Sequence, residues 1–154
     1  MKIEIERKFL VEGDGWRPLT VETLYRQGYL NGDRQRTVRI RTDGYRAFIT
    51  IKGPAAGTAR AEYEYEIPAE DADIILEKLC EKPLIEKIRH RITVGEHTWE
   101  IDEFFGENAG LIIAEVELLR EDETFERPPW LGREVTGDPS YYNANLVRNP
   151  YKNW

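Results

Sequence analysis

The chain has 154 residues, the size of one domain with a hydrophobic core, and 40% of them are hydrophobic and 33% charged, as in globular proteins. The net charge of −7 argues against a protein that coats nucleic acid or an acidic membrane through its overall field. The sequence has one cysteine, which excludes an internal disulfide and a cysteine metal cluster, and no apolar run long enough to span a membrane. We therefore expect a single cytosolic domain over residues 1–154.

Most of the chain alternates between polar and apolar side chains with a period of two, which is typical of β-strands. In chain order, strands are expected at residues 2–10, 24–30, 36–42, 45–52, 60–67, 84–94, 97–104 and 111–119. Short turns join nearly all of them, and Asp43-Gly44 is a strong hairpin signal, so the strands should be mostly antiparallel.

Helical signals occur at three places. Residues 69–82 are rich in good helix formers, have apolar side chains at helical spacing and end before a proline. Residues 121–126 could form one or two helical turns. Asp138 is an N-cap carboxylate followed by Pro139, so a short final helix is expected over residues 139–147.

The polar face of most strands carries charges of one sign. The first strand places two carboxylates, Glu4 and Glu6, and then Lys8 on one face. Neighbouring carboxylates repel one another unless a cation lies between them, so a divalent metal is one candidate occupant and plain solvation is the other. The cationic rows are Arg39 with Arg41, Lys52, and Lys87 with Arg89 and Arg91; the anionic rows are Glu4 with Glu6, Glu62 with Glu64, Glu100 with Asp102, and Glu115 with Glu117.

Eight antiparallel strands can close into a barrel with room for one small ligand, although a two-sheet sandwich is the commoner solution for all-β chains. The charge pattern favours the barrel, because a solvated surface would mix signs within a strand. We therefore predict a mainly β (α+β) fold, an eight-stranded antiparallel closed barrel with a charged lumen. Its apolar exterior would be covered by a few helices, by residues 121–131 with Trp130, or by a partner subunit in a homodimer.

A lumen with a cationic side and an anionic side suits a phosphate chain with bound metal. Arginine offers bidentate geometry to phosphate and lysine a point charge. Carboxylates hold Mg²⁺ or Mn²⁺, which bridge to phosphate oxygens. The expected partner is a triphosphate-containing small molecule, with neither nucleic acid nor membrane.

The run Glu4-Ile5-Glu6-Arg7-Lys8 resembles the ExExK signature of the CYTH domain, the triphosphate tunnel metalloenzyme superfamily. The other paired charges recur in the same order along essentially the whole chain. The resemblance implies an eight-stranded tunnel and hydrolysis of inorganic tripolyphosphate, thiamine triphosphate or nucleoside triphosphates; one branch of the family cyclises ATP.

The resemblance also implies roles for individual residues. The metal ligands would be Glu4, Glu6, Glu115 and Glu117, and the phosphate-binding residues Lys8, Arg39, Arg41, Lys52, Lys87 and Arg89. Glu62, Glu64 and Asp102 would serve a second metal and the attacking water. Tyr29 is either a core aromatic or a lumen hydroxyl near Lys8, and we include it among the catalytic candidates.

We expect metal-dependent hydrolysis of inorganic tripolyphosphate, because no feature of the sequence clearly supplies a platform for a base. The alternatives are a nucleoside or thiamine triphosphatase, a class IV-type adenylate cyclase and, from another class, a non-catalytic polyphosphate-binding module. The final helix would either pack on the barrel exterior or plug one tunnel opening, and we favour the plug.

Overall fold

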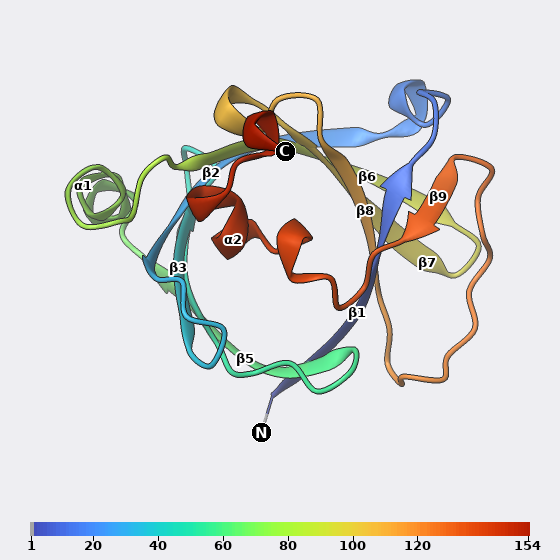
Figure 1. Ribbon diagram of the computed structural model, residues 1–154, viewed down its shortest axis with the longest axis horizontal. Helices are drawn as coiled ribbons and strands as arrows, with labels where there is room; N and C mark the ends of the chain where they lie inside the picture. The colour runs from blue at the N-terminus through green and yellow to red at the C-terminus, as the bar shows by residue number, and fades with distance from the viewer. Residues whose placement is uncertain (1) are drawn as a thin grey trace.

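Eight antiparallel strands close into a barrel in the computed structural model, which describes residues 2–154 (Figure 1). They are β1 (Ile3–Val11), β2 (Val21–Asn31), β3 (Thr37–Thr42), β4 (Ala47–Lys52), β5 (Ala59–Ile67), β6 (Ile85–Val94), β7 (His97–Phe104) and β8 (Ile112–Glu117). Around the barrel the order is β5, β4, β3, β2, β6, β7, β8 and β1, and pairing of β1 with β5 closes the ring. This closure confirms the predicted barrel and excludes the sandwich.

Strand β1 is the seam of the barrel. Its first residues, from Ile3 to Ile5, pair with β5, and the following residues, from Glu6 to Leu10, pair with β8. Near its end, β1 also pairs with a short additional strand, β9 (Leu131–Glu134). The alternation did not reveal β9, because its four residues have no apolar face.

Apolar side chains gather on the outside of the barrel wall, since the alternation sends the charged ones inward. Outside β1, β7 and β8, the rings of Phe9 and Trp130 both meet Trp99 edge-on, with centroids 5.7 and 5.5 Å from its own. Such edge-to-face pairs stabilise a core beyond the apolar area that they bury. As expected from its Trp130, the segment that follows β8 covers this cluster.

Helix α1 (Ala69–Lys78) covers a second exterior cluster, where its Ala72 and Leu76 pack against β3 and β4. The helix ends four residues before the predicted end. The backbone N–H of Glu81 donates a hydrogen bond to a β2 carbonyl at 3.0 Å, not to a carbonyl of the helix. The Lys82 ammonium donates a hydrogen bond to a carbonyl of the last helical turn at 2.9 Å. Tertiary contacts therefore end α1 before the proline does.

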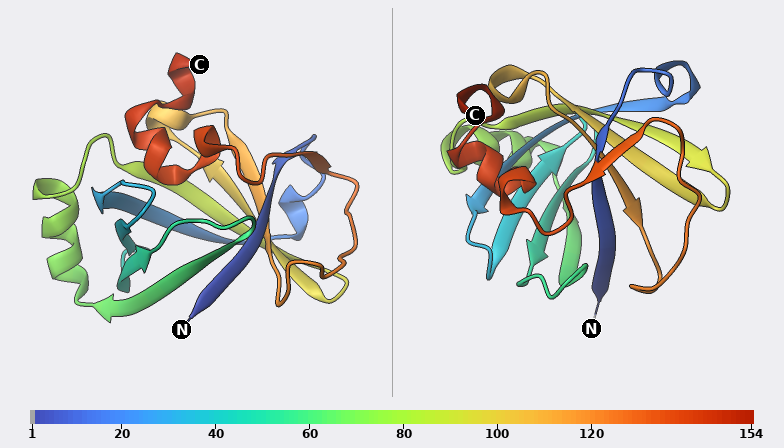
Figure 2. Two further views of the ribbon diagram at one scale, coloured as in Figure 1. Left: turned by 60° about the horizontal axis from the view of Figure 1, so that its bottom comes forward. Right: turned by 45° about the vertical axis from the view of Figure 1, so that its right-hand side comes forward.

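The C-terminal segment is broken into two short helices, η3 (Pro139–Tyr141) and α2 (Asn143–Arg148), where a single helix over 139–147 was expected. The predicted N-cap is confirmed, because the Asp138 carboxylate accepts a hydrogen bond from the backbone of η3 at 3.0 Å. Tyr142 interrupts the helix with extended backbone angles, φ −69° and ψ 132°. Both pieces lie across one end of the barrel, whereas α1 lies on its flank (Figure 2).

The expectation of helical turns at 121–126 was wrong, since this segment is irregular. Its Phe125 instead packs edge-on against Phe9 and Trp99, with ring centroids 6.0 and 5.5 Å apart. The remaining helical turns are η1 (Arg17–Leu19), η2 (Gly106–Asn108) and η4 (Tyr151–Asn153). Within residues 2–154, no helix combines the length and the apolar character that a membrane crossing requires.

Some apolar side chains stay uncovered on the outer faces of β1, β4 and β5, among them Ile3, Ile51 and Tyr65. The homodimer through the barrel exterior stays a prediction.

Candidate functional site

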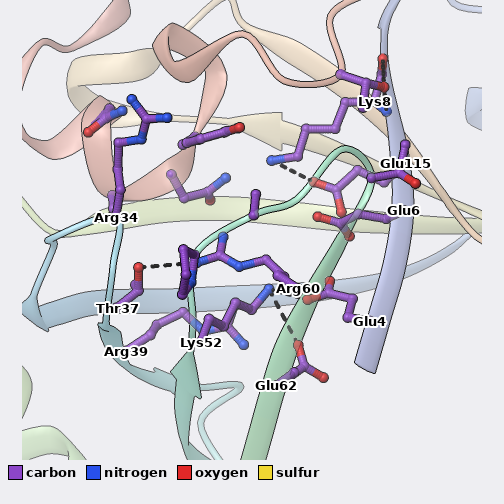
Figure 3. Close-up of a pocket in the computed structure, with 18 of the residues that line it drawn as sticks. Glu4, Glu6, Lys8, Arg34, Thr37, Arg39, Lys52, Arg60, Glu62 and Glu115 are labelled. Carbon is purple, nitrogen blue, oxygen red and sulfur yellow. Dashed lines mark hydrogen bonds and ion pairs between the residues drawn. The ribbon is translucent and has the colours of Figure 1, made fainter. Parts of the chain in front are cut away.

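The lumen holds a cavity of about 320 Å³, walled by side chains from all eight barrel strands and from the C-terminal segment (Figure 3). All but one of the site residues expected from the sequence line it. These are Glu4, Glu6, Lys8, Tyr29, Arg39, Arg41, Lys52, Glu62, Glu64, Lys87, Arg89, Glu115 and Glu117. The alternation of the strands thus predicted correctly which side chains face inward.

The strand order separates the charges into two arcs. Strands β4, β3, β2 and β6 are consecutive around the barrel, and they carry the cationic rows of β3, β4 and β6 on either side of a neutral β2. Strands β7, β8, β1 and β5 complete the ring and carry the anionic rows. Lys8 on β1 and Arg60 on β5 are cations within the anionic arc. The two-sided lumen expected from the charge pattern is therefore confirmed.

Most lumen cations contact a carboxylate. Ion pairs join Lys8 to Glu115 at 3.5 Å and Lys52 to Glu62 at 3.4 Å (Figure 3). Further ion pairs join Lys52 to Glu4 at 2.8 Å, Arg39 to Glu64 at 3.5 Å and Arg89 to Glu100 at 3.2 Å. Lys8 is buried, which lowers its pKa, but the carboxylates of Glu115 and Glu6 outweigh burial and raise it overall. The lumen carboxylates therefore partly neutralise the lumen cations.

Asp102 lies behind the cationic wall and is only 1% exposed. Its two oxygens accept hydrogen bonds from the Arg89 guanidinium at 2.8 and 2.9 Å, and the Lys87 ammonium lies 2.9 Å away. Burial would raise the pKa of this carboxyl, but the two cations hold it well below its usual range. These surroundings favour a role for Asp102 as the counter-ion that fixes Arg89 and Lys87, rather than the catalytic role expected from the sequence.

Tyr29 has features of both roles that the sequence left open, a core aromatic and a lumen hydroxyl. Its ring belongs to the apolar cluster under the C-terminal helices, which also contains Leu146 and Val147, and it is 4% exposed. Its hydroxyl accepts a hydrogen bond from Gln27 at 3.3 Å, and the residue lines the cavity.

The carboxylates of β1 and β8 repel one another across the seam. Glu6 stands opposite Glu117 in the antiparallel register. Burial raises the pKa of Glu117, and the charges of Glu4 and Glu62 raise it further. Burial and the charge of Glu6 likewise raise the pKa of Glu115. A cation would relieve this repulsion, so the donor set fits a divalent metal.

The ligands are not preassembled, however. Among the described residues 2–154, no three Asp, Glu, His or Cys side chains gather closely enough to hold a metal as they stand. Glu4 illustrates why: its Oε2 is buried and faces the Lys52 ammonium at 2.8 Å without hydrogen-bond geometry. In this structure the cation beside Glu4 is therefore the Lys52 ammonium.

Sequence reasoning missed several lumen residues. Arg60 follows the parity of the anionic β5 row, and it donates to the Gly53 carbonyl at 3.0 Å and to the Thr37 hydroxyl at 3.4 Å (Figure 3). Its parity with Glu62 could have identified it. Gln27 and the C-terminal Asn143 are uncharged, so looking for rows of like charge in the sequence does not identify them.

The C-terminal segment contributes directly to the cavity wall. Residues from Tyr142 to Asn145 line it, and the Lys8 ammonium lies 5.3 Å from the centre of the Tyr142 ring. The Asn143 Oδ1 accepts a hydrogen bond from Lys87 at 2.8 Å. The segment thus packs on an apolar layer at one end of the barrel and closes over that end of the lumen, so its placement agrees with the expected plug.

Comparisons with known proteins agree with this geometry. The CYTH domain model matches residues 2–151. An inorganic triphosphatase of Acetivibrio thermocellus is 54% identical, covering 98% of this chain and 97% of its own, and one of Nitrosomonas europaea is 38% identical, covering 94% and 96%. The crystal structure of an inorganic triphosphatase superposes with a TM-score of 0.65 at 34% identity, over 93% of this chain and 96% of that one.

Proposed function

Because this chain belongs to the CYTH domain family, we propose that it hydrolyses inorganic tripolyphosphate inside the barrel, with residues 1–154 as one domain and Mg²⁺ or Mn²⁺ as cofactor. The observation that carries the proposal is the division of the lumen into a cationic and an anionic arc. A phosphate chain with a bound divalent cation presents the complementary charges to both arcs. The curated relatives, named inorganic triphosphatases, support the choice of substrate.

In this proposal the cationic arc binds and orients the phosphate chain. Arg39, Arg41 and Arg89 offer paired donors to phosphate oxygens, and Lys8, Lys52 and Lys87 offer point charges. Holding the chain in line with an attacking water is the main task of a protein that catalyses phosphoryl transfer.

The anionic arc has two tasks. Glu4, Glu6, Glu115 and Glu117 would hold the metal, which neutralises phosphate oxygens and acidifies bound water. Glu62 and Glu64 would orient the attacking water and take up its proton.

Ligand binding would exchange partners within the lumen. Lys8 and Lys52 face Glu115 and Glu4 in the free protein. If Glu115 and Glu4 held a metal, the two ammonium groups would become available to phosphate oxygens. The free protein thereby keeps opposite charges paired until both parts of the ligand arrive.

A non-catalytic polyphosphate-binding module would use the same cationic arc. It has no use for four carboxylates side by side on β1 and β8, of which Glu4 and Glu115 are buried and Glu115 and Glu117 have raised pKa values. Burying such charges is costly, so their presence favours a metal-dependent reaction over binding alone.

The experiment that tests the proposal measures phosphate release from tripolyphosphate with Mg²⁺, with Mn²⁺ and with excess EDTA. We expect release only with metal, and a rate lowered by about two orders of magnitude or more in Glu6→Gln. Glu77→Gln, the same change on the exposed face of α1, serves as control and should keep the wild-type rate. Undiminished release in EDTA, or a near-normal rate in Glu6→Gln, would contradict the metal assignment.

A further inference from the structure

Two amide side chains connect the C-terminal segment to the cationic wall. Gln27, on the neutral strand β2, is fully buried. Its Oε1 accepts a hydrogen bond from Arg41 Nε at 3.0 Å, and its Nε2 donates to Asn143 Oδ1 at 3.0 Å. Asn143 Oδ1 also accepts from Lys87 Nζ at 2.8 Å. Gln27 and Asn143, which we call the amide relay, therefore touch two cations of the wall at once.

At Arg41, the relay takes the place that a carboxylate has beside the other cations of the wall. Among the described residues, Arg41 has no carboxylate within 4.0 Å, although the other cations of the β3, β4 and β6 rows each have one. The Arg41 guanidinium is held by Gln27 and by the Tyr25 ring, whose centre lies 4.6 Å away. Burial and the neighbouring Arg39 and Arg89 lower the pKa of Arg41 to about 9.

An amide and a carboxylate differ in one respect that matters here. Both accept a hydrogen bond from a guanidinium or ammonium, so both can fix its direction. A carboxylate also neutralises the cation, whereas an amide leaves its charge available to a ligand. Arg41 and Lys87 gain orientation from the relay without gaining a competing anion.

We propose that Gln27 and Asn143 are positioning residues, an inference that rests on the proposed function. They aim Arg41 and Lys87 at the phosphate chain, and because they are uncharged, Arg41 keeps no carboxylate partner and Lys87 none besides Asp102. The C-terminal segment thus supplies a specific part of the substrate-binding site through Asn143, beyond closing the lumen.

Asn143→Asp tests the inference most sharply, because the aspartate keeps both acceptor contacts and changes only the charge. The matched control is Asn149→Asp, which adds the same charge at an exposed position of the same segment outside the cavity. Two quantities would be measured for each variant: the Kd for tripolyphosphate by calorimetry in EDTA, and KM and kcat for tripolyphosphate with Mg²⁺.

We expect Asn143→Asp to weaken tripolyphosphate binding and raise KM at least about tenfold, which corresponds to about 1.4 kcal/mol, with a smaller change in kcat. Its melting temperature should equal or exceed that of the wild type, because the new carboxylate pairs with Lys87. Gln27→Glu should likewise raise Kd by pairing with Arg41. Asn149→Asp should stay within about twofold of the wild type, since exposed charges are screened.

If the amide relay had only a structural role, the variants would show the opposite pattern of binding and melting temperature. Asn143→Asp would then bind tripolyphosphate as Asn149→Asp does, or would melt clearly below the wild type, and either result would overturn the inference. Failure of the proposed function looks different: the wild type itself would release no phosphate from tripolyphosphate.

Discussion

Single residues in the lumen carry charges that the free protein only partly neutralises. Burial lowers the pKa of Lys87 to about 7, an effect that Asp102 opposes and that Arg89 and Arg41 strengthen. On the opposite arc, burial raises the pKa of Glu115. Burial is the first cause of both shifts, and neighbouring like charges, Arg89 and Arg41 at Lys87 and Glu6 at Glu115, add to it. A ligand that brings phosphate to one arc and metal to the other relieves both.

Asp102→Asn tests the role of counter-ion. The change leaves Lys87 and Arg89 buried beside a neutral amide, and breaking a buried ion pair in this way typically costs about 3 kcal/mol or more. Denaturant unfolding of the variant should show a loss of this size. Glu100→Gln, which removes the more exposed partner of Arg89, should cost about 1 kcal/mol or less. An Asp102→Asn protein as stable as the wild type would return Asp102 to the catalytic candidates.

Lys87 also predicts how stability depends on pH. The unfolded chain holds the Lys87 proton up to its ordinary pKa of 10.5, while the folded protein releases it at about 7. Between these values the unfolded state binds more protons, so this residue makes the free energy of unfolding rise with pH, by at most about 1.4 kcal/mol per pH unit. Comparing wild type with Lys87→Met at pH 7 and pH 9 should show the wild type gaining relative stability at pH 9. A difference that is the same at both pH values would contradict the lowered pKa.

At the level of elements, period-two alternation allowed the barrel strands and their inward faces to be predicted, because side-chain direction in a strand depends only on parity. It could not reveal features that depend on tertiary contacts. Residues 121–126 have helix-forming side chains, yet the burial of Phe125 against Trp99 keeps them irregular. Likewise, nothing in the neutral residues Gln27 and Asn143 indicates a site until the fold brings them together.

Tyr142 and Leu146 of the C-terminal segment have different tasks, and two substitutions should separate them. Tyr142, just before α2, lines the lumen beside Lys8, whereas Leu146, within α2, is fully buried in the apolar cluster under the C-terminal helices. Tyr142→Ala should alter kcat or KM for tripolyphosphate in a protein of near-normal melting temperature, because an open lumen admits water and weakens its electrostatic interactions. Leu146→Ala should lower the free energy of unfolding by about 2–5 kcal/mol.

These two substitutions also distinguish the plug from a simple cover. Wild-type kinetics in a well-folded Tyr142→Ala protein would rule out a kinetic role for the lumen-facing side of the segment.

In the molecule as a whole, charged side chains line the barrel lumen and most apolar side chains pack on the outside of the barrel wall. Its stability derives from the exterior clusters under α1 and under the segment after β8, and from the apolar layer that the C-terminal helices cover at one end of the barrel. The rest of the lumen is therefore free to carry groups that serve a ligand. Its cavity of about 320 Å³ is lined mainly by polar and charged side chains, which suits a bare phosphate chain better than a base or a thiazole ring.

Substrate preference distinguishes a lumen built for a bare phosphate chain from one that also holds a base or a thiazole ring. Specificity constants for tripolyphosphate, pyrophosphate, ATP, GTP and thiamine triphosphate should be measured in a single phosphate-release assay with Mg²⁺ or Mn²⁺, with a separate check for cyclic AMP. We predict that tripolyphosphate exceeds ATP at least about tenfold, or about 1.4 kcal/mol of transition-state binding. An equal or higher specificity constant for ATP or thiamine triphosphate, or formation of cyclic AMP, would contradict a lumen built for a bare phosphate chain.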